Sequence, residues 1–205
     1  MPDRLPDRFF DTVTLSNFAL SGAFDLLVDR YGRSLCVTEQ VRAELASGRI
    51  RGYSELKVVE QALAAGSILP ADAMTTPESE IFVDLLRNLG SGEASCVTLA
   101  RHRNGIVATD DRAARRSCAE RGVPVTGTIG ILKALCTDKT ITSEEADATL
   151  ALHGEDRILL TRAEHQRSPV TGALKKDRRM DVHAFVAPAE TLIRIMLVDM
   201  IPVCR

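Results

Sequence analysis

Apolar positions along the chain follow two alternating spacings, which predict strands separated by helices. Short apolar runs rich in β-branched residues predict strands at residues 9–15, 34–37, 67–69, 105–109 and 123–126. Helical spacing predicts helices at residues 17–28, 39–48, 55–65, 79–89, 93–102, 112–121, 128–135 and 143–152. Alternating strands and helices are typical of a parallel sheet covered on both faces, so we expect an α/β fold.

Local signals set some of the expected boundaries. Thr38 precedes a helical pattern and is a favoured N-cap residue, and Gly48 is placed to end that helix. Ser143 begins a later helix, with Ala146 where a capping box has Glu.

The size and composition of the chain predict one globular domain with an appended tail. It has 205 residues, of which 45% are hydrophobic and 26% charged, as in ordinary soluble domains. Its character changes near Ser168, and a basic run is then followed by a short apolar segment. We therefore expect a domain over residues 1–170 and a tail of undefined role over 171–205.

Charge, cysteine content and targeting signals restrict the function classes. The net charge of −2 shows no basic excess, although a divalent cation can reverse the sign of an acidic site. Five cysteines without C-x-x-C spacing predict a reducing cytoplasm and no zinc site. We see no apolar signal segment and no apolar stretch of about 18 residues, and therefore expect a cytoplasmic protein without a membrane span.

Acidic residues fall where the predicted sheet would gather them. Asp11 lies at the end of the first strand, and Asp110 and Asp111 follow a later strand, while Glu44 and Glu93 lie on helices. Ligands of parallel sheets bind beyond the carboxyl ends of the strands. Clustered carboxylates repel one another, and Mg²⁺ or Mn²⁺ relieves that repulsion. With 28 acidic residues, helix caps and solvated loops remain alternatives for each one.

Several polar residues near these acids are candidate supporting groups. Ser16 and Asn17 are placed to orient Asp11 or a water, or to cap the next helix. Thr109 is either a hydrogen-bond donor to a carboxylate or a plain strand residue. Three arginines share a helix face and are either contacts for RNA phosphates or part of a solvated surface: Arg112, Arg115 and Arg116.

Three blocks of sequence resemble the PIN-domain family, in particular its VapC-like members. These are FFDTVTLSNF, VTEQVRAEL, and the block that runs from GSGEAS to TDDRAARR and beyond. The similarity extends over about residues 7 to 170. It implies a three-layer α/β/α fold with a central parallel sheet, and Mg²⁺- or Mn²⁺-dependent cleavage of RNA.

The resemblance also implies roles for individual acids. Asp11 matches the first acid of the family, Glu44 the second, and Glu93 a third position at which many relatives have Asp. The last acid falls on the Asp110-Asp111 pair, and the register of the wider family favours Asp111. These residues are thus the expected catalytic and metal-binding groups.

The resemblance implies partners as well as chemistry. Many relatives are toxins that a small antitoxin protein inhibits, and VapC-like proteins commonly form homodimers. An apolar stripe fits either a dimer interface or packing within the chain: Ile81, Phe82, Leu85, Leu86 and Leu89. The apolar tail segment 192–201 is a second candidate interface. The alternative function is a non-catalytic PIN protein that binds RNA or a protein partner.

Overall fold

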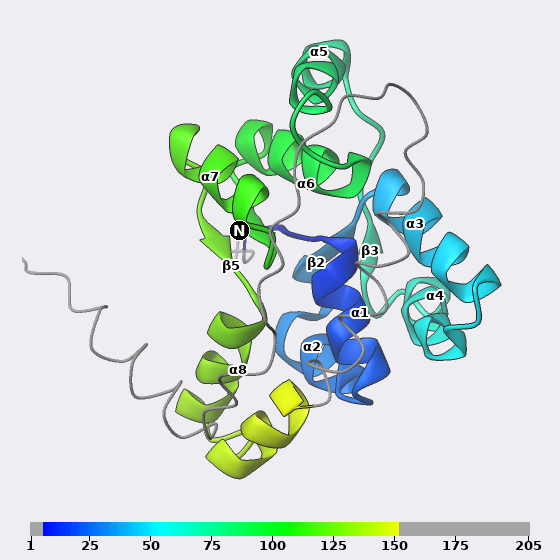
Figure 1. Ribbon diagram of the computed structural model, residues 1–205, viewed down its shortest axis with the longest axis vertical. Helices are drawn as coiled ribbons and strands as arrows, with labels where there is room; N and C mark the ends of the chain where they lie inside the picture. The colour runs from blue at the N-terminus through cyan, green and yellow to red at the C-terminus, as the bar shows by residue number, and fades with distance from the viewer. Residues whose placement is uncertain (1–5, 152–205) are drawn as a thin grey trace, which may run out of the picture. The chain divides into compact units, whose positions relative to one another are not determined.

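The computed structural model describes residues 6–151, which fold around a five-stranded parallel sheet (Figure 1). The strand order is β3-β2-β1-β4-β5. The strands are β1 (Arg8–Phe10), β2 (Leu35–Val37), β3 (Leu69–Pro70), β4 (Ile106–Ala108) and β5 (Val125–Thr126). Every neighbouring pair is parallel, so the expected α/β fold with a central parallel sheet is confirmed.

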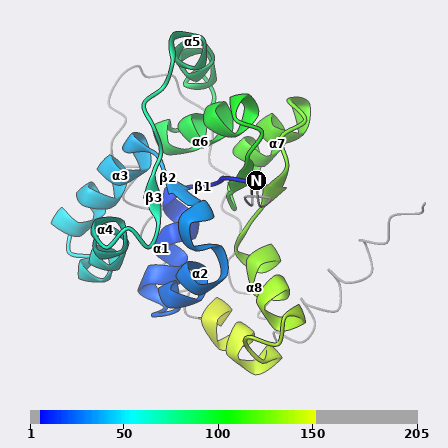
Figure 2. The same cartoon turned by 180° about the vertical axis from the view of Figure 1, so that it is seen from behind.

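Helices connect the strands. They are α1 (Thr12–Leu20), α2 (Phe24–Tyr31), α3 (Glu39–Ile50), α4 (Lys57–Ala64), α5 (Thr76–Leu85), α6 (Ser91–His102), α7 (Arg112–Glu120) and α8 (Thr128–Thr137), with 3-10 turns η1 (Gly32–Ser34) and η2 (Ser54–Leu56). Residues 143–151 are also helical. Figures 1 and 2 show α5, α6 and α7 on one side of the sheet and α1, α2 and α8 on the other.

The strand order explains this division into layers. From β1 the chain moves outward to β2 and β3, and it then crosses back beyond β1 to β4 and β5. Connections between parallel strands are almost always right-handed. Connections that move in opposite directions along the sheet therefore place their helices on opposite faces.

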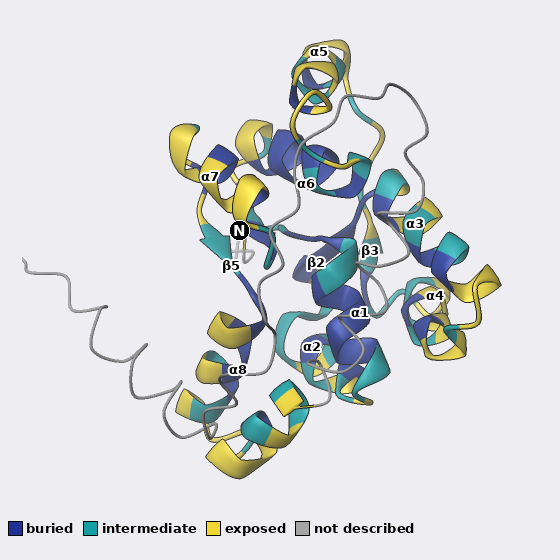
Figure 3. Cartoon of the chain, viewed as in Figure 1, coloured by how far each residue is buried: buried dark blue, intermediate teal, exposed yellow. Residues whose placement is uncertain are grey.

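The core lies between the sheet and its two helical layers. Phe9, Phe10 and Phe18 are among the largest fully buried side chains, and every residue of β2 is buried. In α6, residues 94–100 are all buried, and Figure 3 shows this helix and α1 as mainly buried elements. The burial of α6 fixes the position of its N-terminal turn, which carries Glu93.

The predicted first strand was too long. Residues 9–15 suggested a strand because they contain β-branched residues, but β1 ends at Phe10 and α1 begins at Thr12. The carboxylate of Asp11 accepts a hydrogen bond from the Thr14 amide at 2.6 Å, and this N-cap starts the helix at once. The predicted helix 17–28 is likewise two helices, separated at Gly22, whose φ of 71° interrupts a right-handed helix.

Two predicted helix boundaries were also wrong. Gly48 does not end α3, which continues to Ile50; a Cβ on Gly48 would lie 2.7 Å from Cδ1 of Leu56, so glycine serves close packing there. The last described helix is capped by Thr142 rather than Ser143. The Thr142 amide donates to Glu145 at 2.8 Å, and the Glu145 amide donates to the Thr142 hydroxyl at 3.2 Å.

The expected tail, residues 171–205, lies outside the described residues. Among residues 6–151, no helix has both the length and the apolar character needed to cross a bilayer.

A partly buried ion pair joins the first turn of α5 to the C-cap residue of α6. The Glu78 side chain is 4% exposed, and its carboxylate accepts hydrogen bonds from Nε of Arg103 at 2.8 Å and Nη2 at 3.0 Å. The Thr75 amide donates to the same carboxylate at 2.7 Å. The hydrogen bonds from Arg103, opposed by burial, lower the pKa of Glu78 to about 2.

We expect Glu78→Gln to destabilise the protein near neutral pH by roughly 1.5–3 kcal/mol, as for loss of hydrogen bonds to a charged group. Because the pKa of Glu78 is lower in the folded state, the ionised carboxylate stabilises the fold at pH values above the usual pKa of 4.5. This stabilisation decreases as the pH falls toward about 2. In chemical denaturation, the difference in stability between the variant and the wild type should therefore shrink as pH falls from 4.5 toward about 2. Glu60→Gln, which alters an exposed pair with Arg49, should have little effect. Equal stability of Glu78→Gln and wild type at pH 7 would contradict the expectation.

Candidate active site

The acids predicted to act together lie beyond the carboxyl ends of the two central strands. Phe10 in β1 pairs with Ala108 in β4, so Asp11 and Thr109 stand at the same level of the sheet. The Asp11 amide continues the pairing with a 3.0 Å hydrogen bond to the Ala108 carbonyl. Because the connections reverse direction between β1 and β4, this edge is the topological switch point where α/β sheets bind ligands.

Asp11 is held in a desolvated position. It is 1% exposed, and its second carboxylate oxygen accepts a hydrogen bond from the Thr109 hydroxyl at 2.5 Å. Burial raises the pKa of Asp11 to about 6, although the hydrogen bonds from Thr109 and Thr14 oppose the shift. The cap of α1 is thus also a carboxylate whose charge is costly to bury.

Thr109 connects the two acid-bearing turns. Its hydroxyl donates to Asp11 and accepts from the Asp111 amide at 3.1 Å. The residue is fully buried. Thr109 is therefore a hydrogen-bond donor to a carboxylate, the first of the two roles considered from the sequence, and not a plain strand residue.

Glu44 extends from α3 to the beginning of α6. Its Oε1 accepts from the Ser91 hydroxyl at 2.7 Å and the Gly92 amide at 2.8 Å, while its Oε2 accepts from the Thr12 hydroxyl. A Cβ on Gly92 would lie 2.4 Å from Oε2 of Glu44, so the carboxylate approaches the backbone closely. The N-terminal end of a helix favours such a negative charge.

Glu93 lies in the first turn of α6, beside the other acids. Burial, with smaller contributions from the charges of Asp11, Glu44 and Asp111, raises its pKa to about 7. These repulsive couplings indicate that the fold places acids from four distant segments of the sequence near one another. The predicted catalytic acids therefore share one electrostatic environment.

The adjacent Asp110 and Asp111 have different surroundings. Asp111 caps α7, and its Oδ1 accepts from the Ala114 amide at 2.7 Å. Asp110 contacts the beginning of α8, where the Thr128 amide donates to Oδ1 at 3.0 Å and the Thr128 hydroxyl to Oδ2 at 2.5 Å. Nδ2 of Asn17 also reaches Oδ2 of Asp110, at 3.3 Å.

The predicted supporting residues in α1 do not cap the next helix. Ser16 and Asn17 are both buried within α1. Asn17 contacts Asp110 and Thr128 through Nδ2, instead of orienting Asp11. Its position as the ninth residue of the FFDTVTLSNF block gave no sign of this partner, because the contact joins residues far apart in the chain.

The three arginines of α7 differ in their surroundings. Nη1 of Arg115 donates to the carbonyl oxygens of Thr109 and Thr126, at 2.8 Å each. Arg115 thus joins the ends of β4 and β5. Arg112 and Arg116 are exposed beside it.

Sequence analysis missed three hydroxyl residues at this edge, namely Thr12, Ser91 and Thr128. Thr12 and Ser91 donate to Glu44, and Thr128 donates to Asp110. Their nearness to candidate acids or to glycine-rich turns was the available signal. Ser and Thr are common at helix starts for capping alone, so that signal did not distinguish them.

The donor chemistry of this edge fits a hard divalent cation, since carboxylate oxygens are its preferred ligands and a cation would offset their mutual repulsion. The pKa values of Asp11 and Glu93, raised to about 6 and about 7, mark the two carboxylates whose charges burial disfavours most. Within residues 6–151, however, no three Asp, Glu, His or Cys side chains are arranged so that they could hold a metal ion. The hydrogen bonds of Glu44 to α6 and Thr12 are contacts that such binding would have to rearrange.

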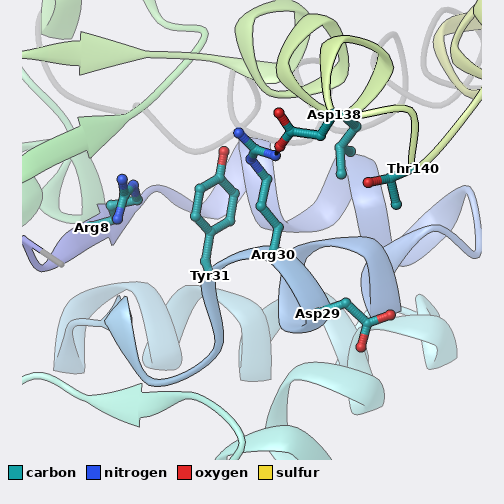
Figure 4. Close-up of a pocket in the computed structure, with 7 residues that line it drawn as sticks. Arg8, Asp29, Arg30, Tyr31, Asp138 and Thr140 are labelled. Carbon is teal, nitrogen blue, oxygen red and sulfur yellow. Dashed lines mark hydrogen bonds and ion pairs between the residues drawn. The ribbon is translucent and has the colours of Figure 1, made fainter. Parts of the chain in front are cut away.

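A separate pocket of about 420 Å³ lies near the start of β1, away from the acids (Figure 4). The guanidinium groups of Arg8 and Arg30 lie 5.0 and 5.5 Å from the centre of the Tyr31 ring. Arg30 also forms an ion pair with Asp138, and Asp29 lines the same pocket. Two positive and two negative side chains balance, so the lining favours neither an anion nor a cation.

The raised pKa of Glu93 predicts how stability depends on pH. In the metal-free protein its ionisation should destabilise the fold as pH rises from the usual value of 4.5 through about 7. We expect Glu93→Gln to raise the melting temperature at pH 8 by a few degrees, since about 1 kcal/mol shifts it by about 2–4 °C at this chain length.

The gain from Glu93→Gln should disappear near pH 4, where the wild-type carboxyl is protonated in both states. Thermal unfolding in EDTA measures the effect, and Glu80→Gln, at an exposed position of α5, is the matched control. A melting temperature at pH 8 below that of the wild type would contradict the expectation.

Comparison with known proteins places this arrangement in a family. A family model with the description "DUF3368: PIN domain" matches residues 8–163, well over half of the chain. No curated protein matches the chain. Among solved structures it is similar to the "Crystal structure of PAE2754 from Pyrobaculum aerophilum", with 16% identity, 55% of this chain and 86% of that chain covered, and a TM-score of 0.40. The family model covers every acid described above, and the chain belongs to the PIN-domain family.

Proposed function

We propose that the protein is a Mg²⁺- or Mn²⁺-dependent endoribonuclease. Membership in the PIN-domain family supports a nuclease-type activity. The observation that carries the proposal is the electrostatic coupling of Glu93 to Asp11, Glu44 and Asp111. An enzyme retains such mutually repelling charges where they serve a ligand or a reaction.

Asp11, Glu44, Glu93 and Asp111 are the groups that would hold the cation, with Asp110 as the less favoured alternative to Asp111. A bound divalent cation supplies a nucleophilic water and stabilises charge on the phosphate. The chain's own hydrogen bonds orient the acids beforehand: Thr14 and Thr109 fix both oxygens of Asp11, and Ala114 fixes one oxygen of Asp111. Exposed Arg112 and Arg116 are suited to contact RNA phosphates.

The alternative is a non-catalytic PIN protein that binds RNA or a protein partner. The complete set of acids favours catalysis, because binding alone does not require charges that destabilise one another. By its resemblance to VapC-like proteins, we further propose a cytoplasmic toxin of a type II toxin–antitoxin pair, inhibited by a small antitoxin protein.

Asp11→Asn tests the catalytic proposal. The substitution preserves a capping side chain but removes one charged ligand, so the fold should persist while RNA cleavage falls about 100-fold or more, as loss of several kcal/mol of transition-state stabilisation implies. Excess EDTA should abolish cleavage by the wild type.

Cleavage of labelled RNA with Mn²⁺ or Mg²⁺ is the measurement for Asp11→Asn, and circular dichroism checks its fold. Asp25→Asn, at an exposed position of α2, is the matched control and should cleave normally. Full activity of Asp11→Asn, or of the wild type in EDTA, would leave the non-catalytic alternative.

We also propose a homodimer, which uses the exposed part of α5 and the residues that follow it. Leu85 of the predicted stripe is buried, and Ile81, Phe82 and Leu89 pack against the core. Apolar surface nevertheless remains at Val83, 61% exposed, and Leu86, 42% exposed.

Light scattering should give a dimer mass for the wild type at high micromolar concentration and a monomer mass for the double variant Val83→Lys, Leu86→Lys. Ile50→Lys, at an exposed position of α3, should stay dimeric, whereas a monomeric wild type rules the dimer out.

A further inference from the structure

We propose that Asn17, Asp110 and Thr128 form a positioning network that sets the distance between the two acid-bearing turns, and that Thr128 thereby controls divalent-metal affinity without touching the metal. The inference rests on the proposed metal-dependent function. It assigns Asp110 to the support of the site rather than to its ligands. It also adds Thr128, in a helix that carries none of the expected acids.

The network joins three segments through buried groups. Asn17 is 5% exposed and Thr128 3% exposed. Nδ2 of Asn17 donates to Oδ2 of Asp110 at 3.3 Å and to the Thr128 hydroxyl at 3.1 Å. Thr128 in turn donates to Asp110 through both its amide and its hydroxyl. The side chain of Asp110 is thus held from α1 and α8 together.

The same elements carry the acids whose spacing matters. Asp11 is the N-cap of α1, and Asn17 lies further along that helix, so the helix links the two rigidly. Asp110 is the neighbour of Asp111 in the turn after β4. A fixed contact between Asn17 and Asp110 therefore limits how far Asp111 can move from Asp11.

The hydrogen bonds also distinguish the two adjacent aspartates. Both oxygens of Asp110 are engaged, by Thr128 and Asn17, and its charge faces the beginning of α8, which favours an anion. In the described part of the chain, hydrogen bonds reach only Oδ1 of Asp111. Oδ2 of Asp111 thus stays available to a cation, whereas Asp110 would have to break its network first.

Gly127 shows that the packing around Asp110 is tight. A Cβ at this position would lie 2.5 Å from Oδ1 of Asp110 and 2.9 Å from the Thr109 carbonyl oxygen. Only glycine lets the start of α8 approach the acid-bearing turn so closely. The close approach allows the Thr128 amide to reach Asp110.

Calorimetric titration of the metal-free full chain with Mn²⁺ tests the network. Thr128→Val removes the hydroxyl at nearly constant volume. We expect the affinity for Mn²⁺ to fall about 10–100-fold, which is typical when a residue that hydrogen-bonds near a metal site without binding the metal is lost. Thr128→Ser restores the hydroxyl and should recover most of the affinity. The matched control is Thr98→Val in α6, where the buried hydroxyl has no hydrogen-bond partner among the described residues. This variant should bind Mn²⁺ as the wild type does.

The outcomes separate the inference from the function on which it rests. A folded wild type that does not bind Mn²⁺ overturns both. Wild-type affinity in Thr128→Val, even with a lowered melting temperature, leaves the metal proposal standing and shows that the network is merely structural. Equal losses in Thr128→Val and Thr98→Val also overturn the inference, because any added buried methyl then weakens binding. If Thr128→Val does not fold, Asn17→Ala removes the donor on the other side of Asp110 and must weaken Mn²⁺ binding in the same way.

Discussion

The burial of carboxylates close to one another at one edge of the sheet is the constraint on which the rest of the site depends. Asp11 is buried, and its pKa of about 6 reflects the free-energy cost of a charge removed from water. Glu93, with a pKa of about 7, adds repulsion from three further acids. The folded chain must hold these groups together although they destabilise one another, and a stable core is therefore needed close beside them.

Hydrogen-bond donors and helix ends partly offset this cost. Asp11 and Asp111 each cap a helix, and Glu44 and Asp110 contact the beginnings of α6 and α8. Each of these carboxylates thus meets the positive end of a helix dipole. Glu93 lies in the first turn of α6, yet burial, with smaller contributions from the charges of three acids, still raises its pKa to about 7. The acids of this PIN domain are at once its helix caps and its candidate ligands.

The gathering of the acids could be predicted from the sequence because it follows from topology. Alternating strands and helices predict a parallel sheet, and residues that follow its central strands must meet at one edge. Topology was enough to place Asp11 and the Asp110-Asp111 pair at this edge, whereas the preference for Asp111 came from the resemblance to PIN domains. The length of the first strand was mispredicted, since the β-branched residues around Thr14 favour a strand, whereas the cap formed by Asp11 starts a helix.

The partners of the acids could not be predicted in the same way. Asn17 and Asp110 are 93 positions apart, and Asn17 and Thr128 are 111 apart, so no local spacing indicates their contacts. Asp110 and Asp111 are chemically identical neighbours, and periodicity alone cannot assign one to the support and the other to the ligand set. The approach of α8 separates them, and it depends on Gly127. A Cβ at that position would collide with Oδ1 of Asp110. The fold fixes which acids meet at this edge. Packing of the distant α8 then determines that Asp110 faces a helix, while one oxygen of Asp111 stays available to a cation.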